Sequence, residues 1–596
     1  MVQILNFKFK SLLKKMNEKF IHNIYEHKML LMFLLSILIG VISGFGAIFF
    51  RYLIFFNHLL FNLIPFYLGA TFIMLPPVIG GLIVGLLTNR LGKETKGHGV
   101  PEIMESMALK GGRINKRVAL LKMLVSSITI GSGGSAGREG PIAQIGASAG
   151  STIGQVSKLD ENNIKILVAC GVSSGIAATF NAPFGGLLFG IEVILSMTRL
   201  NAKILINLIM SIVIANLISI LFLGNHPAFF IQTVFWFNGP FDFILYALLG
   251  IILGFLGIFF VKFFYFIEDI FDKIKIPNYL KPALGGLGVG LIALFFSQSI
   301  MGVGYETIEL TLGLGIPVFT LLLLGLFKIF ATSLTVGSGG SGGIFAPSLF
   351  IGATFGGCIG FLFYFLFPGQ VSYPMAFALV GMGALFAGVA RAPLTCIIMT
   401  VEMTSDYLLI IPLMISCVLS YLINSLIMKE ENIYTLKLLR RGVRIKYNYY
   451  TDLYDDIEVS EVMNKNVATI DEEMPIFELL EKIEMEQHMG YPVLNKEKEL
   501  IGIVAFSDVR KAILDGNKEI LAKDLCKRKL ISSFPDETIH DIMIKMLKHD
   551  IGRLPVVDRR NPKKILGIIT RSDIVKAHEL ESIKAKLLES DEEKDK

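Results

Sequence analysis

Apolar residues dominate a long first part of the chain, and a more polar, alternating sequence follows it. From about residue 29 to residue 428 the chain consists largely of Leu, Ile, Phe, Gly and Ala, whereas the remainder reads as a soluble α/β sequence. A helix needs about 20 apolar residues to cross the hydrocarbon core of a bilayer. Segments such as 29–56, 204–223, 243–266 and 408–427 are long and apolar enough to meet this requirement. The pattern therefore predicts a polytopic α-helical membrane domain, with further short and Gly-interrupted segments as partial or tilted spans.

Within this apolar part the chain repeats itself. The phrase GSGGSAGREGP at 131–141 returns as GSGGSGGIFAP at 337–347, and the segment 181–192 is similar to 391–402. An apolar chain that duplicates itself is typical of transporter folds, in which a site lies where the two halves meet.

The Gly-rich phrases also carry a chemical prediction. Backbone that is not helical at membrane depth must line a protein-walled cavity, and the free N–H groups at a helix start attract anions. Glu139 lies inside the first phrase. A carboxylate beside helix-start amides within a membrane indicates a functional site. The alternative is a carboxylate that only complements the helix dipole.

Composition agrees with the membrane assignment and does not favour a nucleic-acid partner. Of 596 residues, 53% are hydrophobic and 18% charged, whereas a soluble protein carries about a quarter charged residues. The net charge of +6 is spread over many loops and does not indicate a nucleic-acid partner. The five cysteines have neither metal nor disulfide spacing. Residues 1–28 hold six lysines and no cleavage site, so we expect a basic cytoplasmic flank on the membrane surface.

The soluble part is a second repeat. Residues 456–514 and 523–580 share one layout, in which a short helix is followed by a strand, a helix, a strand ending in Pro-Val, and a strand that turns into a last helix. A linker at about 515–522 joins the two units, and we expect residues 581–596 to form a charged, disordered tail.

This layout resembles a pair of CBS domains. The resemblance implies a module that binds ATP, ADP or AMP, with the Thr-x-x-Asp after the last strand holding the ribose. The second unit has Thr570 and Asp573 at this place, whereas the first has Ala505 and keeps only Asp508. Each aspartate has a structural alternative as a helix cap. The nucleotide-binding residues that the resemblance implies are Thr469, His488, Tyr491, Thr570, Arg571 and Asp573.

Four phrases of the membrane part resemble the anion-pathway motifs of the CLC chloride channel and transporter family. They are GHGVP at 97–101, GREGP at 137–141, GIFAP at 343–347 and the tyrosine in IYTLKL at 433–438. The resemblance covers about residues 29–440. It implies a CLC fold of two halves in inverted topology, a homodimer with one pore in each subunit, and a cell-membrane location with the CBS pair in the cytoplasm. It implies chloride as the substrate, no required cofactor and no enzymatic activity.

The resemblance also assigns roles to individual residues. The amides of Ile344 and Phe345 and the hydroxyl of Tyr434 would form a central anion site. The amides around 138–140 would form an outer site. Glu139 would be the gate, which occupies an anion site when ionised and swings away when protonated. The anion-binding residues are then His98, Gly99, Arg138, Gly140, Ile344, Phe345 and Tyr434.

Two positions depart from the family pattern. The common serine of the first motif is His98, whose bulkier N–H can gain charge near neutral pH, unless the ring points away and only packs. The second, cytoplasmic-side glutamate of proton-coupled members is replaced by Val193, which cannot relay a proton. The neighbouring Glu192 has a repeat mate in Glu402, and this suggests a shared structural role.

We therefore expect selective movement of chloride or a similar small anion, channel-like or weakly proton-coupled. Within the same class the alternatives are a Cl−/H+ antiporter with another proton route and a fluoride exporter. From other classes, a CBS-gated divalent-cation channel would need acidic rings in the membrane part, where this sequence offers backbone amides. A nonconducting nucleotide-sensing receptor has no positive feature in its favour.

Overall fold

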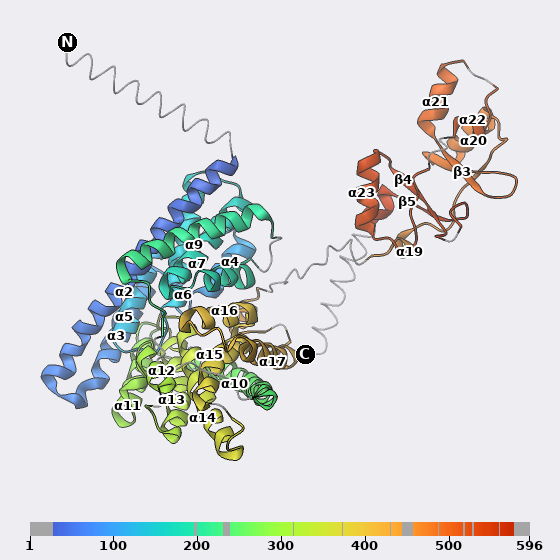
Figure 1. Cartoon of the computed structure of the whole chain (residues 1–596). Helices are drawn as coiled ribbons and strands as arrows, with labels where there is room; N and C mark the ends of the chain where they lie inside the picture. The colour runs from blue at the N-terminus through green and yellow to red at the C-terminus, as the bar shows by residue number, and fades with distance from the viewer. Residues whose placement is uncertain are drawn as a thin grey trace, which may run out of the picture. The chain divides into compact units, whose positions relative to one another are not determined.

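The computed structural model divides the chain into two compact units, Met1–Tyr447 and Asn448–Lys596 (Figure 1). It describes residues 28–195, 200–229, 239–313, 315–371, 373–429, 431–443, 457–486, 488–516, 519–526, 530–559 and 561–576. The expected basic flank at 1–28, except its last residue, and the expected tail at 581–596 lie outside these residues.

The first unit is helical, and among its described residues eight helices are long and apolar enough to cross a membrane. The apolar segments 29–56, 204–223, 243–266 and 408–427 fall on α2, α9, α10 (Pro240–Lys273) and α17 (Ile410–Met428). The first half contains α2 (Lys28–Leu68), α3 (Leu75–Leu91), α4 (Val100–Leu109), α5 (Arg117–Gly131), α6 (Glu139–Val156), α7 (Glu161–Phe180), α8 (Pro183–Phe189) and α9 (Ala202–Leu223). Short 3-10 turns lie at Ala70–Met74 and Lys93–Thr95, and a π-helical turn follows α8 at Gly190–Ile194.

The second half repeats this series of long and short helices. It contains α10 (Pro240–Lys273), α11 (Lys281–Phe295), α12 (Tyr305–Leu312), α13 (Val318–Gly337), α14 (Phe345–Leu366), α15 (Pro374–Ala390), α16 (Pro393–Thr404), α17 (Ile410–Met428) and α18 (Thr435–Arg440). A 3-10 turn at Gln298–Ile300 precedes α12. In Figure 1 the first half runs from blue to teal and the second from green to gold, and the two pack beside each other in one unit.

Each half is built around one close helix crossing. In the first half α6 meets α7 at Gly146 and Gly171, where a Cβ on either glycine would lie 2.0 Å from the carbonyl oxygen of the other. In the second half α14 meets α15 at Gly352 and Gly381, with 2.3 and 2.4 Å for the same distances. Small residues let backbones approach in this way within membranes. The crossings bring the starts of α6 and α14, with their Gly-rich phrases, into the middle of the unit.

The second unit holds two small sheets. In the first repeat β1 (Ile470–Asp471) pairs in parallel with β2 (Gly490–Leu494), and β2 pairs antiparallel with β3 (Leu500–Ala505). In the second repeat β4 (Arg553–Val557) pairs antiparallel with β5 (Ile565–Thr570), and Ser533 bridges to Val556. The helices are α19 (Val459–Val462), α20 (Ile476–Glu486), α21 (Phe506–Leu514), α22 (Ala522–Leu525) and α23 (Ile539–His549).

The short helix that opens each repeat packs into the core of the other repeat. Val459 of α19 is buried among residues of the second repeat, and its amide donates to the carbonyl of Glu537 at 2.9 Å. Ala522 of α22 is buried among residues of the first repeat, and its amide donates to the carbonyl of Met474 at 2.9 Å. Each core is therefore assembled from both repeats, and the pair forms one interlocked body.

Candidate anion pathway

The two Gly-rich phrases meet in the middle of the membrane unit. The amide of Gly137 donates to the carbonyl of Gly343 at 2.7 Å, and the amide of Gly343 donates to the carbonyl of Gly137 at 2.6 Å. These residues hold the same position in the two copies of the phrase. A local two-fold relationship therefore passes between them and sets the start of α6 against the start of α14.

The carboxylate of Glu139 lies at this junction. Its side chain is buried, with 4% of the residue exposed. Oε1 accepts a hydrogen bond from the hydroxyl of Tyr305 at 2.9 Å, and Oε2 accepts one from the backbone amide of Ala346 at 3.5 Å. The carboxylate thus covers the first turn of α14, where backbone N–H groups have no partner within the helix.

Tyr305 is a site residue that the sequence analysis missed. It is the first residue of α12 and follows the N-cap Gly304, which has a φ of 88°. The matching loop of the first half ends at the N-cap Gly99 before α4, also with a φ of 88°. The phrase GVGY at 302–305 is thus the repeat mate of GHGV at 97–100. Extending the repeat to this weaker pair would have pointed to Tyr305.

Two buried lysines hold these paired loops. Lys122 Nζ donates to the carbonyls of Thr95 and Gly97 at 3.1 and 2.8 Å. Its repeat mate Lys328 donates to the carbonyls of Ile300 and Gly302, both at 3.0 Å. An ammonium that binds two carbonyls fixes the loop before each helix start. The loops that carry His98 and Tyr305 are therefore positioned in the same way.

His98 and Tyr434 lie together beside the junction. Their ring centroids are 5.7 Å apart, and the His98 ring also meets Phe264 at 6.1 Å. His98 is 1% and Tyr434 2% exposed. Neither ring nitrogen of His98 has a hydrogen-bond partner among the residues that the structure describes. The start of α6 comes close to this loop, because a Cβ on Gly140 would lie 2.0 Å from the His98 carbonyl oxygen.

The remaining predicted anion-site residues surround the same junction. Ile344 is the buried N-cap of α14, and the Phe345 ring packs against Phe386 at 4.5 Å. Arg138 is the N-cap of α6, and its guanidinium lies 5.0 Å from the centroid of the Tyr305 ring. The guanidinium also donates weakly, at 3.4 Å, to a carbonyl at the end of α7. Arg138 therefore packs beside the Glu139 carboxylate on the side of Tyr305.

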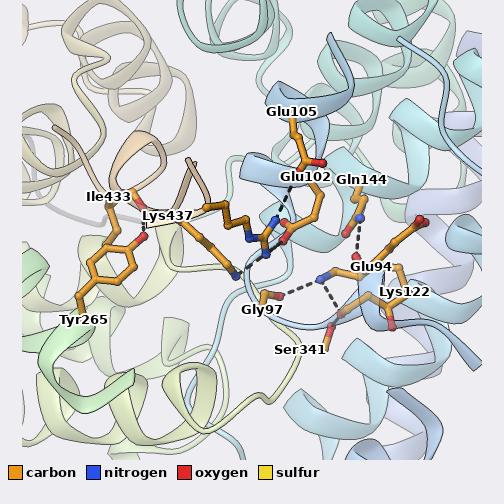
Figure 2. A network of polar contacts seen from close by, with 12 residues as sticks. Glu94, Gly97, Glu102, Glu105, Lys122, Gln144, Tyr265, Ser341, Ile433 and Lys437 are labelled. Carbon is orange, nitrogen blue, oxygen red and sulfur yellow. Dashed lines mark hydrogen bonds and ion pairs between the residues drawn. The ribbon is translucent and has the colours of Figure 1, made fainter. Parts of the chain in front are cut away.

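An ion-pair network ties α18, which begins directly after Tyr434, to α4, which begins after the loop of His98 (Figure 2). Lys437 of α18 reaches Glu102 of α4 at 3.6 Å, and Arg441 reaches the same carboxylate at 3.0 Å. Arg441 also pairs with Glu105 at 3.1 Å. The side chains of Glu102 and Lys437 are each only 11% exposed. The charges therefore fix α18, and with it Tyr434, against α4.

Comparison with known proteins identifies this arrangement. A family model described as voltage gated chloride channel matches residues 80–425, which is more than half of the 596 residues. The chain belongs to the voltage-gated chloride channel (CLC) family. Models of the CBS domain match residues 459–515 and 522–579. The predicted family and fold class are confirmed, and this CLC protein is an integral membrane protein of anion transport, not an enzyme.

Relatives of known name cover both parts of the chain. The H(+)/Cl(−) exchange transporter ClcA of Yersinia pestis is 33% identical over 337 residues, which cover 56% of this chain and 70% of ClcA. Chloride channel protein CLC-f of Arabidopsis thaliana is 27% identical over 577 residues, which cover 83% of this chain and 72% of CLC-f.

Solved structures give the same family. A slow cyanobacterial Cl−/H+ antiporter matches with a TM-score of 0.63 and 28% identity, over 69% of this chain and 97% of that one. A CLC-type fluoride/proton antiporter matches with a TM-score of 0.58 and 24% identity, over 68% of this chain and 97% of that one. The second likeness shows the shared fold alone.

Glu192 and Glu402 play matching structural roles in this CLC protein. Glu192 accepts hydrogen bonds from the amides of Leu394 and Thr395 at 3.2 and 2.8 Å, at the start of α16. Glu402 of α16 accepts from the amides of Phe184 and Gly185 at 3.0 and 2.6 Å, at the start of α8. Each half thus caps a short helix of the other half. Val193 beside Glu192 is buried, with 5% exposed.

The residues that the CBS resemblance assigned to nucleotide binding differ in how deeply their side chains are buried. Asp573 Oδ2 accepts from the amide and the hydroxyl of Thr570 at 2.9 and 2.6 Å, a capping arrangement at the end of β5. Arg571 pairs with Asp550 at 3.8 Å. Tyr491 is fully buried in the first core.

The other two residues lie nearer the surface of the first repeat. His488 is exposed and its ring meets that of Tyr491 at 5.8 Å. Thr469 is half-buried, and its carbonyl accepts from Lys482 at 3.0 Å. Tyr491 is thus part of the core, whereas His488, Thr570 and Asp573 keep side-chain surface that a ligand can reach.

Proposed function

We propose that this CLC protein moves chloride or a similar small anion across the membrane, in a channel-like or weakly proton-coupled way, as a homodimer with one pathway in each subunit. The observation that carries the proposal is the position of the Glu139 carboxylate at the amide end of α14, where the two Gly-rich phrases meet. A site that accepts a carboxylate from backbone amides offers the same donors to a halide.

Glu139 acts as the gate in this proposal. The ionised carboxylate holds the place of an anion and is stabilised there by Tyr305 and the Ala346 amide. Protonation removes the charge and weakens both contacts, because hydrogen bonds to a charged acceptor are the stronger ones. The side chain then swings away, and an anion takes its place on the amides.

The central site lies between the starts of α4 and α14 and the Tyr434 ring. Its ligands are the amides of Ile344 and Phe345, the Tyr434 hydroxyl and the N–H of His98, and Gly99 leaves room for the anion. The amides around Arg138 and Gly140 form the outer site. Backbone donors suit a permeating anion, because they replace its water without a fixed counter-charge that would trap it.

The proposed function and its main alternative, a Cl−/H+ antiporter, differ in how strongly anion movement is coupled to protons. Val193 takes the place of the inner glutamate, and both oxygens of Glu192 are occupied by the start of α16. These features favour weak coupling. The exchange activity in the name of the Yersinia relative favours the alternative, a Cl−/H+ antiporter with another proton route. Fluoride export and, from a different class, a CBS-gated divalent-cation channel are the further alternatives.

The CBS pair gives the proposal a regulatory part. We place it in the cytoplasm as a module that binds ATP, ADP or AMP through the Thr570–Asp573 turn and shifts anion flux. The feature that supports this role is the retained Thr-x-x-Asp in the second repeat, whose side chains already bond to each other.

One experiment tests the transport proposal. Purified full-length protein is reconstituted in liposomes, and chloride efflux and proton movement are recorded together. We expect chloride efflux with little or no uphill proton movement. A fixed ratio of protons to chloride would establish the antiporter, and a preference for fluoride would establish the exporter. Flux of a divalent cation without anion flux would overturn the proposal.

A further inference from the structure

The imidazole of His98 is deeply buried, and its two nitrogens have no hydrogen-bond partner within the part of the chain that the structure describes. The residue is 1% exposed, and among the described residues neither Nδ1 nor Nε2 has a hydrogen-bond partner. A buried polar group without a partner destabilises the fold, because it has lost its hydrogen bonds to water. The ring faces Tyr434 and Phe264, in the central site of the proposed pathway. Both nitrogens therefore need a ligand that this site supplies.

An anion alone does not meet this need. A neutral imidazole has one N–H and one lone pair, so a halide at the N–H leaves the lone pair unsatisfied or repelled. An imidazolium has two N–H donors but is a buried charge, which is costly without a partner of opposite sign. A proton on the second nitrogen removes the lone pair that an anion would meet. An anion beside the ring in turn neutralises the buried positive charge that this proton creates.

We infer that the central site takes up a proton together with its anion, and that His98 is the acceptor of this proton. The inference rests on the proposed function and adds a second ligand to the same site. Anion and proton then bind with positive coupling, and by linkage each raises the affinity for the other by the same factor.

The charges around the ring make this coupling steep. They come from Glu102 on α4, Lys122 on α5, and Lys437 and Arg441 at α18, while the titratable Glu139 on α6 precedes Gly140, which meets the His98 carbonyl. The three cations repel a proton on the ring. Glu102 opposes them, but it is already bound by Lys437 and Arg441. The ring therefore gains its proton readily only when an anion supplies the counter-charge.

A polar cavity lies on the far side of Lys437 from the loop of His98. A cavity of about 460 Å³ is lined by Lys96, Glu268, Asp272 and Lys437, among other charged residues. Lys437 borders both the cavity and the loop, because a Cβ on Gly97 would lie 2.5 Å from its Nζ. Water in such a cavity reaches Lys437, whose ammonium lies beside Gly97, the residue before His98.

The test counts protons in halide binding. The parent is full-length protein with Glu139→Gln, so that the gate does not titrate. Bromide is titrated calorimetrically in pairs of buffers with different ionisation enthalpies, between about pH 5 and pH 8, where an imidazole changes charge. We expect uptake of up to about one proton per bromide and an affinity that rises by up to about tenfold for each unit of pH decrease.

Two matched variants assign the proton. His98→Asn and His98→Gln, each made in the Glu139→Gln parent, keep an N–H donor near Nδ1 or Nε2 but cannot be protonated. We expect both to bind bromide with a proton count near zero and an affinity independent of pH. Size-exclusion profiles report folding. The parent alone already decides whether a proton is taken up, so a variant that fails to fold does not remove the test.

Two results would overturn the inference: bromide binding to the parent without proton uptake, or an unchanged proton count in the folded His98 variants. Liposomes distinguish this failure from failure of the proposed function. Anion flux with proton-independent bromide binding leaves the transport proposal standing and removes the inference. Proton-linked bromide binding without anion flux leaves the inference standing and removes the transport proposal.

Discussion

The hydroxyl of Tyr305 donates to Glu139 Oε1 at 2.9 Å, across 166 residues of sequence and between the two halves of the membrane unit. This contact holds the carboxylate on the amide end of α14. It links the gate that the sequence suggested to a residue that the sequence did not mark. The first prediction concerns this bond.

Tyr305→Phe should make the gate easier to open. The variant keeps the ring and its edge contact with Phe229 at 5.2 Å, but it loses a hydrogen bond to a charged group, worth about 1.5–3 kcal/mol. The ionised, closed state loses this stabilisation. The pH of half-maximal chloride flux should therefore rise by about one to two units, since one unit corresponds to about 1.4 kcal/mol. Flux from liposomes at a series of pH values measures the shift.

The matched control is Tyr246→Phe. It removes a buried hydroxyl that has no hydrogen-bond partner within the described part of the chain. Its flux should follow the wild-type pH profile. If Tyr305→Phe also follows that profile, the contact with Glu139 does not hold the gate.

Glu139→Gln should leave the pathway open. The amide side chain is neutral at every working pH, so at saturating chloride the flux should persist and lose most of its pH dependence. Wild-type flux should rise as pH falls on the side that protonates Glu139. Glu306→Gln, an exposed carboxylate on α12, is the control and should behave as wild type. A pH response of Glu139→Gln equal to that of wild type would place the gate elsewhere, with His98 the next residue to change.

Glu192→Gln and Glu402→Gln should lower stability to a similar degree. Each substitution removes a charge that accepts two backbone N–H groups at a helix start. Charge-assisted bonds of this kind are worth about 1.5–3 kcal/mol. The temperature of loss of monodisperse protein in detergent measures the effect. A loss of proton movement in Glu192→Gln without loss of stability would instead make Glu192 part of a proton route.

The sequence predicted those parts of this molecule that depend on local pattern. Apolar stretches such as 204–223 gave the spans, because length and composition decide whether a helix crosses a bilayer. The two Gly-rich phrases were visible as copies, and the structure brings them together at Gly137 and Gly343. The functional motifs were found because their residues stand close together in the sequence.

Contacts between distant segments could not be predicted in this way. GHGVPE at 97–102 and GVGYET at 302–307 share only two glycines, so the backbone kept its shape while the side chains diverged. The repeat therefore marks the position of Tyr305 only through these two glycines. The exchange of α19 and α22 between the CBS repeats was hidden for a different reason. The sequence of a four-residue helix can indicate that the segment is helical, but it does not indicate which core the helix packs into.

Glu102→Gln should loosen the proposed central site from the side of α18. The carboxylate is 11% exposed and binds both Lys437 and Arg441, so its loss removes the partner of the equally buried Lys437, whereas Arg441 keeps Glu105. Breaking a buried ion pair costs about 3–5 kcal/mol. We expect a clear loss of thermal stability and weaker bromide binding, because α18 no longer holds Tyr434 against α4. Glu105→Gln is the control, since its pair with Arg441 is more exposed and worth at most about 1 kcal/mol. Equal effects of the two variants would contradict a positioning role for Glu102.

The last prediction concerns the two aspartates of the CBS pair, which offer a matched comparison. Asp573 Oδ2 accepts from the amide and hydroxyl of Thr570, whereas Asp508 Oδ2 accepts from the amide of Ala505 at 3.2 Å. Both cap a helix, so Asp573→Ala and Asp508→Ala should each cost about 1 kcal/mol of stability. Of the two repeats, only the second has a hydroxyl, that of Thr570, at the position that we propose for the ribose. Calorimetric titration of the full chain with ATP, ADP and AMP should show binding that Asp573→Ala abolishes and Asp508→Ala retains. If both variants lose nucleotide binding equally, the two aspartates act only as helix caps. If the folded wild-type protein shows no heat of binding, the CBS pair is an assembly module.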